Sequence, residues 1–122
     1  MNRYLAVAAF LAFIAVVAGA FGAHGLKTIL SASELSSWQT AVRFQFFHCL
    51  GVILLVILYR QQTDRLLRWS ANFMLAGMLL FSGSIYLLLL TGIKWLGPVT
   101  PIGGLCLMIS WLILVVSSVR KN

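Results

Sequence analysis

The sequence predicts an all-α membrane protein, a bundle of four transmembrane helices whose N-terminus and C-terminus are both cytoplasmic. Of the 122 residues, 61% are hydrophobic and 9% are charged, a composition that suits lipid rather than water as solvent. Four long apolar runs use up almost the whole chain, and a bilayer core about 30 Å thick needs roughly 20 apolar residues per helix. The chain is therefore expected to form one domain, residues 1–122.

The first apolar run, at residues 5–24, is expected to be a retained transmembrane helix. Small residues recur in it at alternating steps of four and three, at Ala8, Ala12, Ala15, Gly19 and Gly22. They share one helix face, and such a face lets helix backbones approach closely in lipid. The alternative is a cleaved signal peptide, because Arg3 precedes the run and the small residues 18–20 resemble a cleavage site.

A short amphipathic helix is predicted over residues 32–40, before a second span at 41–60. Ser31 and Glu34 have the Ser-x-x-Glu spacing of a capping box, so a helix begins near Ala32. An unbroken helix from there to Tyr59 would be about 40 Å long, too long for an upright span. We therefore expect the short helix to lie on the outer surface and to bend or tilt into the second span.

The third span is predicted at residues 69–91 and the fourth at 99–119. Pro98 and Pro101 bracket the start of the fourth span, where a missing N–H donor costs nothing. Small residues repeat at seven-residue steps in the two spans, at Gly77 and Ser84 and at Gly103, Ser110 and Ser117. This repeat keeps one seam facing a neighbouring helix. The neighbour is either a helix of the same monomer or a second copy in a homo-oligomer.

The basic residues determine the orientation in the membrane. Six of them fall on one side of the alternating spans, namely Arg3, Arg60, Arg65, Arg68, Arg120 and Lys121. Three fall on the other side, namely Lys27, Arg43 and Lys94. The positive-inside rule makes the first side cytoplasmic, and Trp38 and Trp95 are then expected at the outer interface. The net charge of +7 is explained in this way, and no nucleic-acid partner is expected.

Polar residues that could bind a ligand are expected in the outer half of the bundle. At about 100° per residue, Gln45 and His48 share one face of the second span, which should point inward because a buried ionisable group needs a partner. We expect one polar cluster, open or nearly open to the outside, built from His24, Gln45, His48, Ser82, Ser84, Tyr86 and Thr100. The inner half is expected to be almost purely aliphatic apart from the boundary arginines and Asn72, Ser117 and Ser118. The alternative for His24 is a helix cap, and for His48 an interhelical hydrogen bond.

No catalytic residue, metal site or cofactor is predicted. His48 and Cys49 are adjacent, but successive residues diverge by about 100° around a helix and do not easily share an ion. Nucleophilic catalysis by serine would need a Gly-x-Ser-x-Gly motif or an acid near the histidines. Glu34 and Asp64 are the only acids, and they fall on opposite sides of the membrane.

Four ordered motifs extend along nearly the whole chain, at residues 19–26, 40–48, 81–86 and 100–104 with Trp111. In these motifs the chain resembles a family of short four-helix bacterial inner-membrane proteins of unknown function, which includes mitochondrial relatives. The resemblance implies retention of the first helix and an inner-membrane location, and it brings no assigned reaction. The family usually has tyrosine where this chain has Phe44, which puts a role for a phenol hydroxyl there in doubt.

The function predicted from these observations is that of a non-enzymatic membrane protein, either a lipid or small-ligand binder or an accessory subunit. Its partners would be membrane lipids, further copies of the chain or other membrane proteins. Four short helices enclose little interior volume and leave faces such as those of Gly77 and Ser84 available for a homo-oligomer, or else the motif-bearing faces all pack within one monomer. The alternative is a small oligomeric transporter or channel that uses the same polar cluster.

Overall fold

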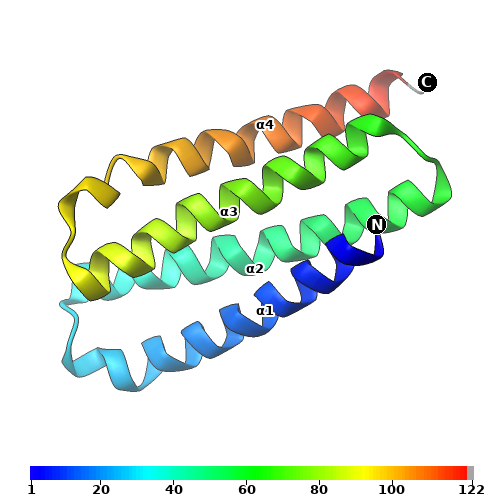
Figure 1. Ribbon diagram of the computed structural model, residues 1–122. Coiled ribbons are helices and arrows are strands. Elements are labelled where there is room, and N and C mark those ends of the chain that lie inside the picture. Colours follow the sequence, from blue (N-terminus) through cyan, green and yellow to red (C-terminus); the bar gives the residue numbers. More distant parts are fainter. Residues whose placement is uncertain (121–122) are drawn as a thin grey trace.

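Four long helices lie side by side in chain order in the computed structural model (Figure 1). The structure describes residues 1–120. The elements are α1 (Asn2–Ala23), η1 (Gly25–Thr28), α2 (Ala32–Gln61), α3 (Arg65–Thr91), η2 (Lys94–Leu96) and α4 (Val99–Arg120), where η marks a short 3-10 turn. Each long helix packs mainly against the next one in the chain, with α1 and α4 outermost (Figure 1). All four helices are long and apolar enough to cross a membrane, so the predicted all-α membrane fold is confirmed.

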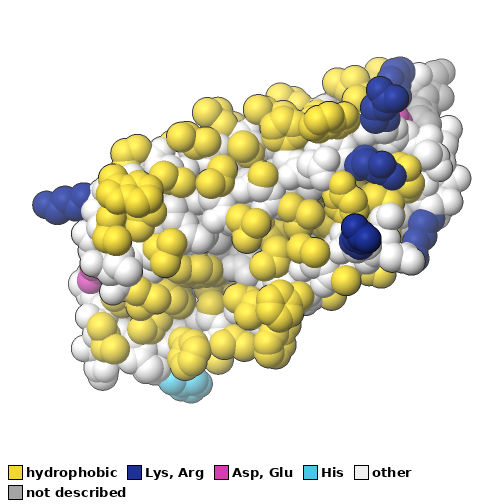
Figure 2. Space-filling view, in the orientation of Figure 1, with side chains coloured by type: hydrophobic (Ala, Val, Ile, Leu, Met, Phe, Trp, Pro, Cys, Tyr) yellow, Lys and Arg dark blue, Asp and Glu magenta, His cyan; other side chains and the backbone are white. Residues whose placement is uncertain are grey.

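The two ends of the bundle differ in charge. Both termini and the α2–α3 connection lie at one end, called here the termini end, and η1 and η2 lie at the other, called the far end (Figure 1). Basic side chains gather at the termini end, whereas hydrophobic side chains cover the visible face between the ends (Figure 2). This separation of charge agrees with the predicted grouping of basic residues, of which Lys121 lies outside the described residues.

The helix predicted over residues 32–40 is not a separate element, which corrects the prediction. Its capping box is present, because Ser31 Oγ accepts the N–H of Glu34 and the Glu34 carboxylate accepts the N–H of Ser31. The helix that begins there continues unbroken to Gln61 over 30 residues, about 45 Å. Its first turns are held against α1, since the Trp38 indole donates to the Ala18 carbonyl at 2.8 Å. Trp38 is consequently buried, with its ring against α1.

The small-residue face of α1 packs against α2, as predicted from its spacing. Ala8 and Ala15 are fully buried. Gly22 lies against the Trp38 ring, where an added Cβ would come within 2.8 Å of Cδ1. The absence of side-chain bulk on this face therefore sets how closely α1 and α2 approach.

The seven-residue repeats form the seam between α3 and α4. A Cβ added to Gly103 would lie 2.3 Å from the backbone nitrogen of Phe81. A Cβ added to Gly77 would lie 2.9 Å from the backbone nitrogen of Leu107. Ser84, which we expected to be available to a second copy, is buried beside α4. The helix faces that suggested a homo-oligomer are thus occupied within one chain, which corrects that argument.

Candidate functional site

The seven predicted site residues do not form one continuous hydrogen-bonded network. Six of them are buried or half-buried between helices, and His24 is exposed. The six belong to separate sets of hydrogen bonds, which cross the α1–α2, α2–α3, α2–α4 and α3–α4 pairs of helices.

Gln45 forms the first set and links three helices. Its amide Nε2 donates to the Leu11 carbonyl of α1 at 2.7 Å, and its Oε1 accepts from the Tyr86 hydroxyl of α3 at 2.7 Å. The Tyr86 ring also packs on Trp38, with ring centroids 4.7 Å apart. Gln45 is only 4% exposed, so these contacts exclude solvent from the point where α1, α2 and α3 meet.

His48 forms the second set and joins α2 to α4. Its Nδ1 lies 2.8 Å from the Phe44 carbonyl, and its Nε2 lies 3.0 Å from the indole nitrogen of Trp111. A carbonyl only accepts and an indole N–H only donates, so these partners assign the neutral imidazole with its proton on Nδ1. Both ring nitrogens are engaged. The adjacent Cys49 faces elsewhere and donates its thiol to Met78 Sδ at 3.6 Å.

The hydroxyl groups form the remaining contacts. Ser82 donates to the Ala41 carbonyl of α2 at 2.6 Å, and the Ser84 hydroxyl meets that of Thr100 across the α3–α4 seam. His24 lies apart from them at the C-terminal cap of α1. Its side chain makes no hydrogen bond to any residue from 1 to 120.

These polar residues hold the helices together and do not line a pocket. Over the described residues, every buried side-chain nitrogen or oxygen has a hydrogen-bond partner. None of the seven residues lines any of four open clefts on the bundle. A buried polar network with all its members satisfied rigidifies a fold and specifies its packing. The geometry therefore favours the structural alternative for His48.

The termini half of the bundle is more polar than predicted. Tyr4 of α1 donates to Asn72 of α3 at 2.6 Å, and Ser70 of α3 donates to the Ser110 carbonyl of α4 at 2.7 Å. The partners are 68 and 40 residues apart in the sequence, so no local pattern pairs them. The termini half therefore holds more paired polar groups than the boundary arginines, Asn72, Ser117 and Ser118 that were expected there.

Asp64 joins the start of α3 to the end of α4. Its Oδ1 accepts the backbone N–H of Leu66 at 3.1 Å and an Arg120 Nη2 at 2.6 Å, and its Oδ2 accepts the Ser117 hydroxyl. The position of Asp64, one residue before the third helix, is the sequence signal of an N-cap. This role was not predicted, because Asp64 was considered only as one of the two acids of the chain.

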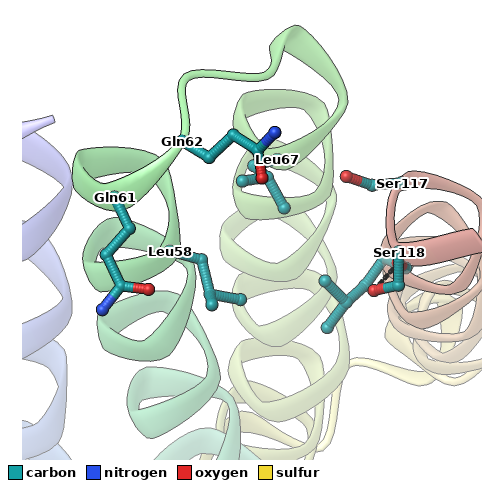
Figure 3. Close-up of a pocket in the computed structure, with 7 residues that line it drawn as sticks. Leu58, Gln61, Gln62, Leu67, Ser117 and Ser118 are labelled. Carbon is teal, nitrogen blue, oxygen red and sulfur yellow. Dashed lines mark hydrogen bonds between the residues drawn. The ribbon is translucent and has the colours of Figure 1, made fainter. Parts of the chain in front are cut away.

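Two clefts open at the termini end, and no sequence pattern predicted either of them. The first, of about 580 Å³, lies between α2, α3 and α4 (Figure 3). It is polar but uncharged, and its lining residues are Leu58, Gln61, Gln62, Leu67, Leu114, Ser117 and Ser118.

The second cleft, of about 590 Å³, is called here the basic cleft. Its lining residues are Met1, Asn2, Arg3, Tyr4, Tyr59, Arg60, Thr63 and Arg68. Contacts within the cleft orient two of the arginines. Arg60 Nη2 donates to Asn2 Oδ1 at 2.5 Å, and Arg68 Nη2 donates to the Tyr59 hydroxyl at 2.9 Å, with its guanidinium carbon 5.3 Å from the Tyr59 ring centroid. The lining contains three arginines and no acid.

Comparison with known proteins places this arrangement in a family. Residues 18–104 match the sequence model of a family described as protein of unknown function (DUF423). The UPF0382 membrane protein SH2409 of Staphylococcus haemolyticus is 38% identical over 98% of each chain. A UPF0382 membrane protein of Haemophilus influenzae is 40% identical over 99% of this chain and 97% of that protein.

A relative named as an inner membrane protein is also similar. The UPF0382 inner membrane protein YgdD of Escherichia coli is 36% identical over 80% of this chain and 75% of that protein. No solved structure matches. The chain is an integral membrane protein, and it belongs to the DUF423 family, whose function is unknown.

Proposed function

We propose that the protein is a non-enzymatic lipid-binding protein of the bacterial inner membrane, and that its basic cleft holds the headgroup of an anionic phospholipid. The observation that carries this proposal is the convergence of Arg3, Arg60 and Arg68, from three different helices, on one cleft. An arginine has five N–H donors, and the single hydrogen bonds to Asn2 and Tyr59 leave most of them available. Arginine binds phosphate in a bidentate manner.

The position of the cleft supports a headgroup as the ligand. The cleft is lined by residues at the termini end, where basic side chains gather beside the hydrophobic surface of the bundle (Figure 2). The excess of basic residues favours a cytoplasmic location for this end, and the cytoplasmic leaflet is rich in anionic lipid. The name of the Escherichia coli relative supports the inner membrane as the location.

The saturated polar contacts between the helices favour lipid binding over transport. A transporter or channel needs polar groups that face a path through the membrane. In the described chain the buried polar side chains are paired with one another or with the backbone. The surface of the bundle is therefore the better candidate for ligand binding.

Native mass spectrometry of the full-length protein tests the proposal. The purified protein is titrated with phosphatidylglycerol or with phosphatidylcholine of the same chains. We expect wild type to retain phosphatidylglycerol preferentially, and Arg60→Gln with Arg68→Gln to lower that retention by about tenfold, because charge-assisted hydrogen bonds are lost.

Arg65→Gln is the matched control. Arg65 is exposed at the same end and does not line the basic cleft, so its substitution should leave retention unchanged. Melting curves would establish that all variants fold. An equal loss in Arg65→Gln and in the double variant would show diffuse attraction to anionic lipid and overturn the proposed site.

A further inference from the structure

We propose that a groove between α1 and α2 forms a second lipid site, which takes one acyl chain of a phospholipid and places its phosphate on Arg43. The groove has a volume of about 310 Å³, and its lining residues are Ala15, Val16, Gly19, Val42, Arg43, Phe46 and Phe47. It shares no residue with the basic cleft. The inference therefore does not rest on the proposed function.

The groove exists because small residues of α1 face larger residues of α2. Gly19 has no side chain, and a Cβ built on it would lie 3.5 Å from Val42 Cγ1, an ordinary contact distance. Val16 of α1 and Phe47 of α2, each 61% exposed, line the groove on the outer surface of the bundle. The result is an apolar depression that opens toward the membrane.

Arg43 is the unusual member of this lining. It is exposed and, over residues 1–120, forms no hydrogen bond or ion pair through its side chain. An arginine within a transmembrane segment is costly unless an anion or water reaches it. The exposed lining of the groove is apolar, so Arg43 contributes its aliphatic stem while its charged head is available to another group.

The depth of Arg43 suits a lipid phosphate. Side chains tilt toward the N-terminus of their helix, and the N-terminus of α2 is at the far end (Figure 1). Gly19, which lies beside Val42, is four residues before the end of α1 at Ala23, about one turn. The Arg43 side chain therefore extends from the groove toward the level at which α1 ends. Because α1 is an apolar helix of about the length that spans a bilayer core, we expect the headgroups to begin near that level.

The lining of the groove favours a phospholipid over a helix of another protein, because it combines an apolar surface with the single cation Arg43. An unbranched acyl chain presents only apolar surface to Val16 and Phe46. A phospholipid combines such a chain with the anion that Arg43 lacks within this structure.

Photocrosslinking of the full-length protein tests the site directly. The probe is phosphatidylglycerol with a photoreactive group in one acyl chain, added to protein in detergent, and the crosslinked peptides are mapped by mass spectrometry. Wild type should crosslink within residues 15–19 and 42–47. Gly19→Leu, which fills the groove, and Arg43→Gln, which removes the cation, should each lower this crosslink by about tenfold.

Matched controls separate the groove from its surroundings. Ala20→Leu adds the same bulk at an exposed position of α1 outside the lining, and Lys94→Gln removes another far-end cation; both should crosslink as wild type does. Diacylglycerol with the same photoreactive chain should crosslink weakly and should not respond to Arg43→Gln. Arg60→Gln should leave the crosslink intact, so failure of the basic cleft and failure of this site are distinguishable.

Two results would overturn the inference. One is an undiminished crosslink in Arg43→Gln. Because Arg43 is exposed, this variant should fold even if Gly19→Leu does not. The other is loss of the crosslink on addition of inorganic phosphate at a concentration equal to that of the lipid, because a free anion would then be the preferred occupant of Arg43.

Discussion

Trp111 donates its indole N–H to Nε2 of His48 at 3.0 Å and so joins two helices that are not consecutive in the chain. The other imidazole nitrogen is bound to the Phe44 carbonyl. His48 cannot bind a metal ion or accept a further proton without giving up one of these contacts. His48, which most resembled a functional group in the sequence, therefore forms an interhelical hydrogen bond that links α2 to α4.

The first prediction concerns the hydrogen bond between Trp111 and His48. Trp111→Phe removes the donor, and His48→Ala removes the acceptor. Hydrogen bonds between transmembrane helices contribute about 0.6 kcal/mol on average and up to about 1.7, so we expect a coupling energy in that range from the double-mutant cycle. Unfolding in mixed micelles with increasing dodecyl sulfate measures it. Trp95→Phe is the control, because this side chain is 69% exposed, and it should leave the unfolding free energy nearly unchanged. If the losses in unfolding free energy from Trp111→Phe and His48→Ala are strictly additive, the two side chains do not interact.

The second prediction concerns Gln45 and Tyr86. Gln45→Leu leaves the half-buried Tyr86 hydroxyl without its 2.7 Å acceptor and should destabilise the bundle by about 1–3 kcal/mol. Tyr86→Phe in the same chain removes the stranded hydroxyl and should recover part of that loss, because replacing both partners by apolar groups is nearly neutral. Unfolding free energies of the two single variants and the double variant provide the test. A double variant no more stable than Gln45→Leu alone would contradict the pairing.

The sequence predicted the fold better than it predicted the site, and particular residues show why. Helix starts depend on local chemistry, such as the Ser31 capping box, and packing faces depend on regular spacing, as at Gly77 and Gly103. Whether polar residues meet depends on how the helices are rotated and paired. Gln45 and His48, three residues apart on one helix, bond to different partners on α3 and α4.

The clefts escaped prediction for a related reason. Arg60 and Arg68 were identified only as charges that orient the chain. Their convergence with Arg3 on one cleft depends on the meeting of α1, α2 and α3 at the termini end. The continuous α2 was also missed, because length alone argued for a break, whereas the contact between Trp38 and Ala18 keeps its first turns packed.

The third prediction concerns Asp64. Asp64→Ala removes the cap of the Leu66 N–H, worth about 0.5–2 kcal/mol, and takes an acceptor from the buried Ser117 hydroxyl. We expect Asp64→Ala to lose about 2 kcal/mol in unfolding free energy. Arg120→Gln should lose less than about 1 kcal/mol, because the Arg120 side chain is 58% exposed and its ion pair is screened by solvent. Asp64→Asn, which keeps a capping oxygen, should fall between them. Equal losses for Asp64→Ala and Arg120→Gln would show that the ion pair, and not the cap, stabilises this end.

The last prediction concerns two adjacent glycines of α4 with opposite surroundings. A Cβ at Gly103 would meet backbone atoms on α3, the Phe81 nitrogen at 2.3 Å and the Gly77 oxygen at 2.9 Å, whereas one at Gly104 would meet only the Phe81 ring at 3.9 Å. Backbone atoms cannot move away by a change of rotamer as a side chain can, so Gly103→Ala must push α3 and α4 apart. The substitution should lower the unfolding free energy by about 3 kcal/mol, the upper range for overpacking. Gly104→Ala should be neutral or should stabilise by up to about 1 kcal/mol, since alanine is the better helix former. Unfolding of both variants under the same conditions measures the difference. Comparable unfolding free energies would contradict the prediction, because they would show that α3 and α4 are not packed as closely as the contact between Gly103 and Phe81 indicates.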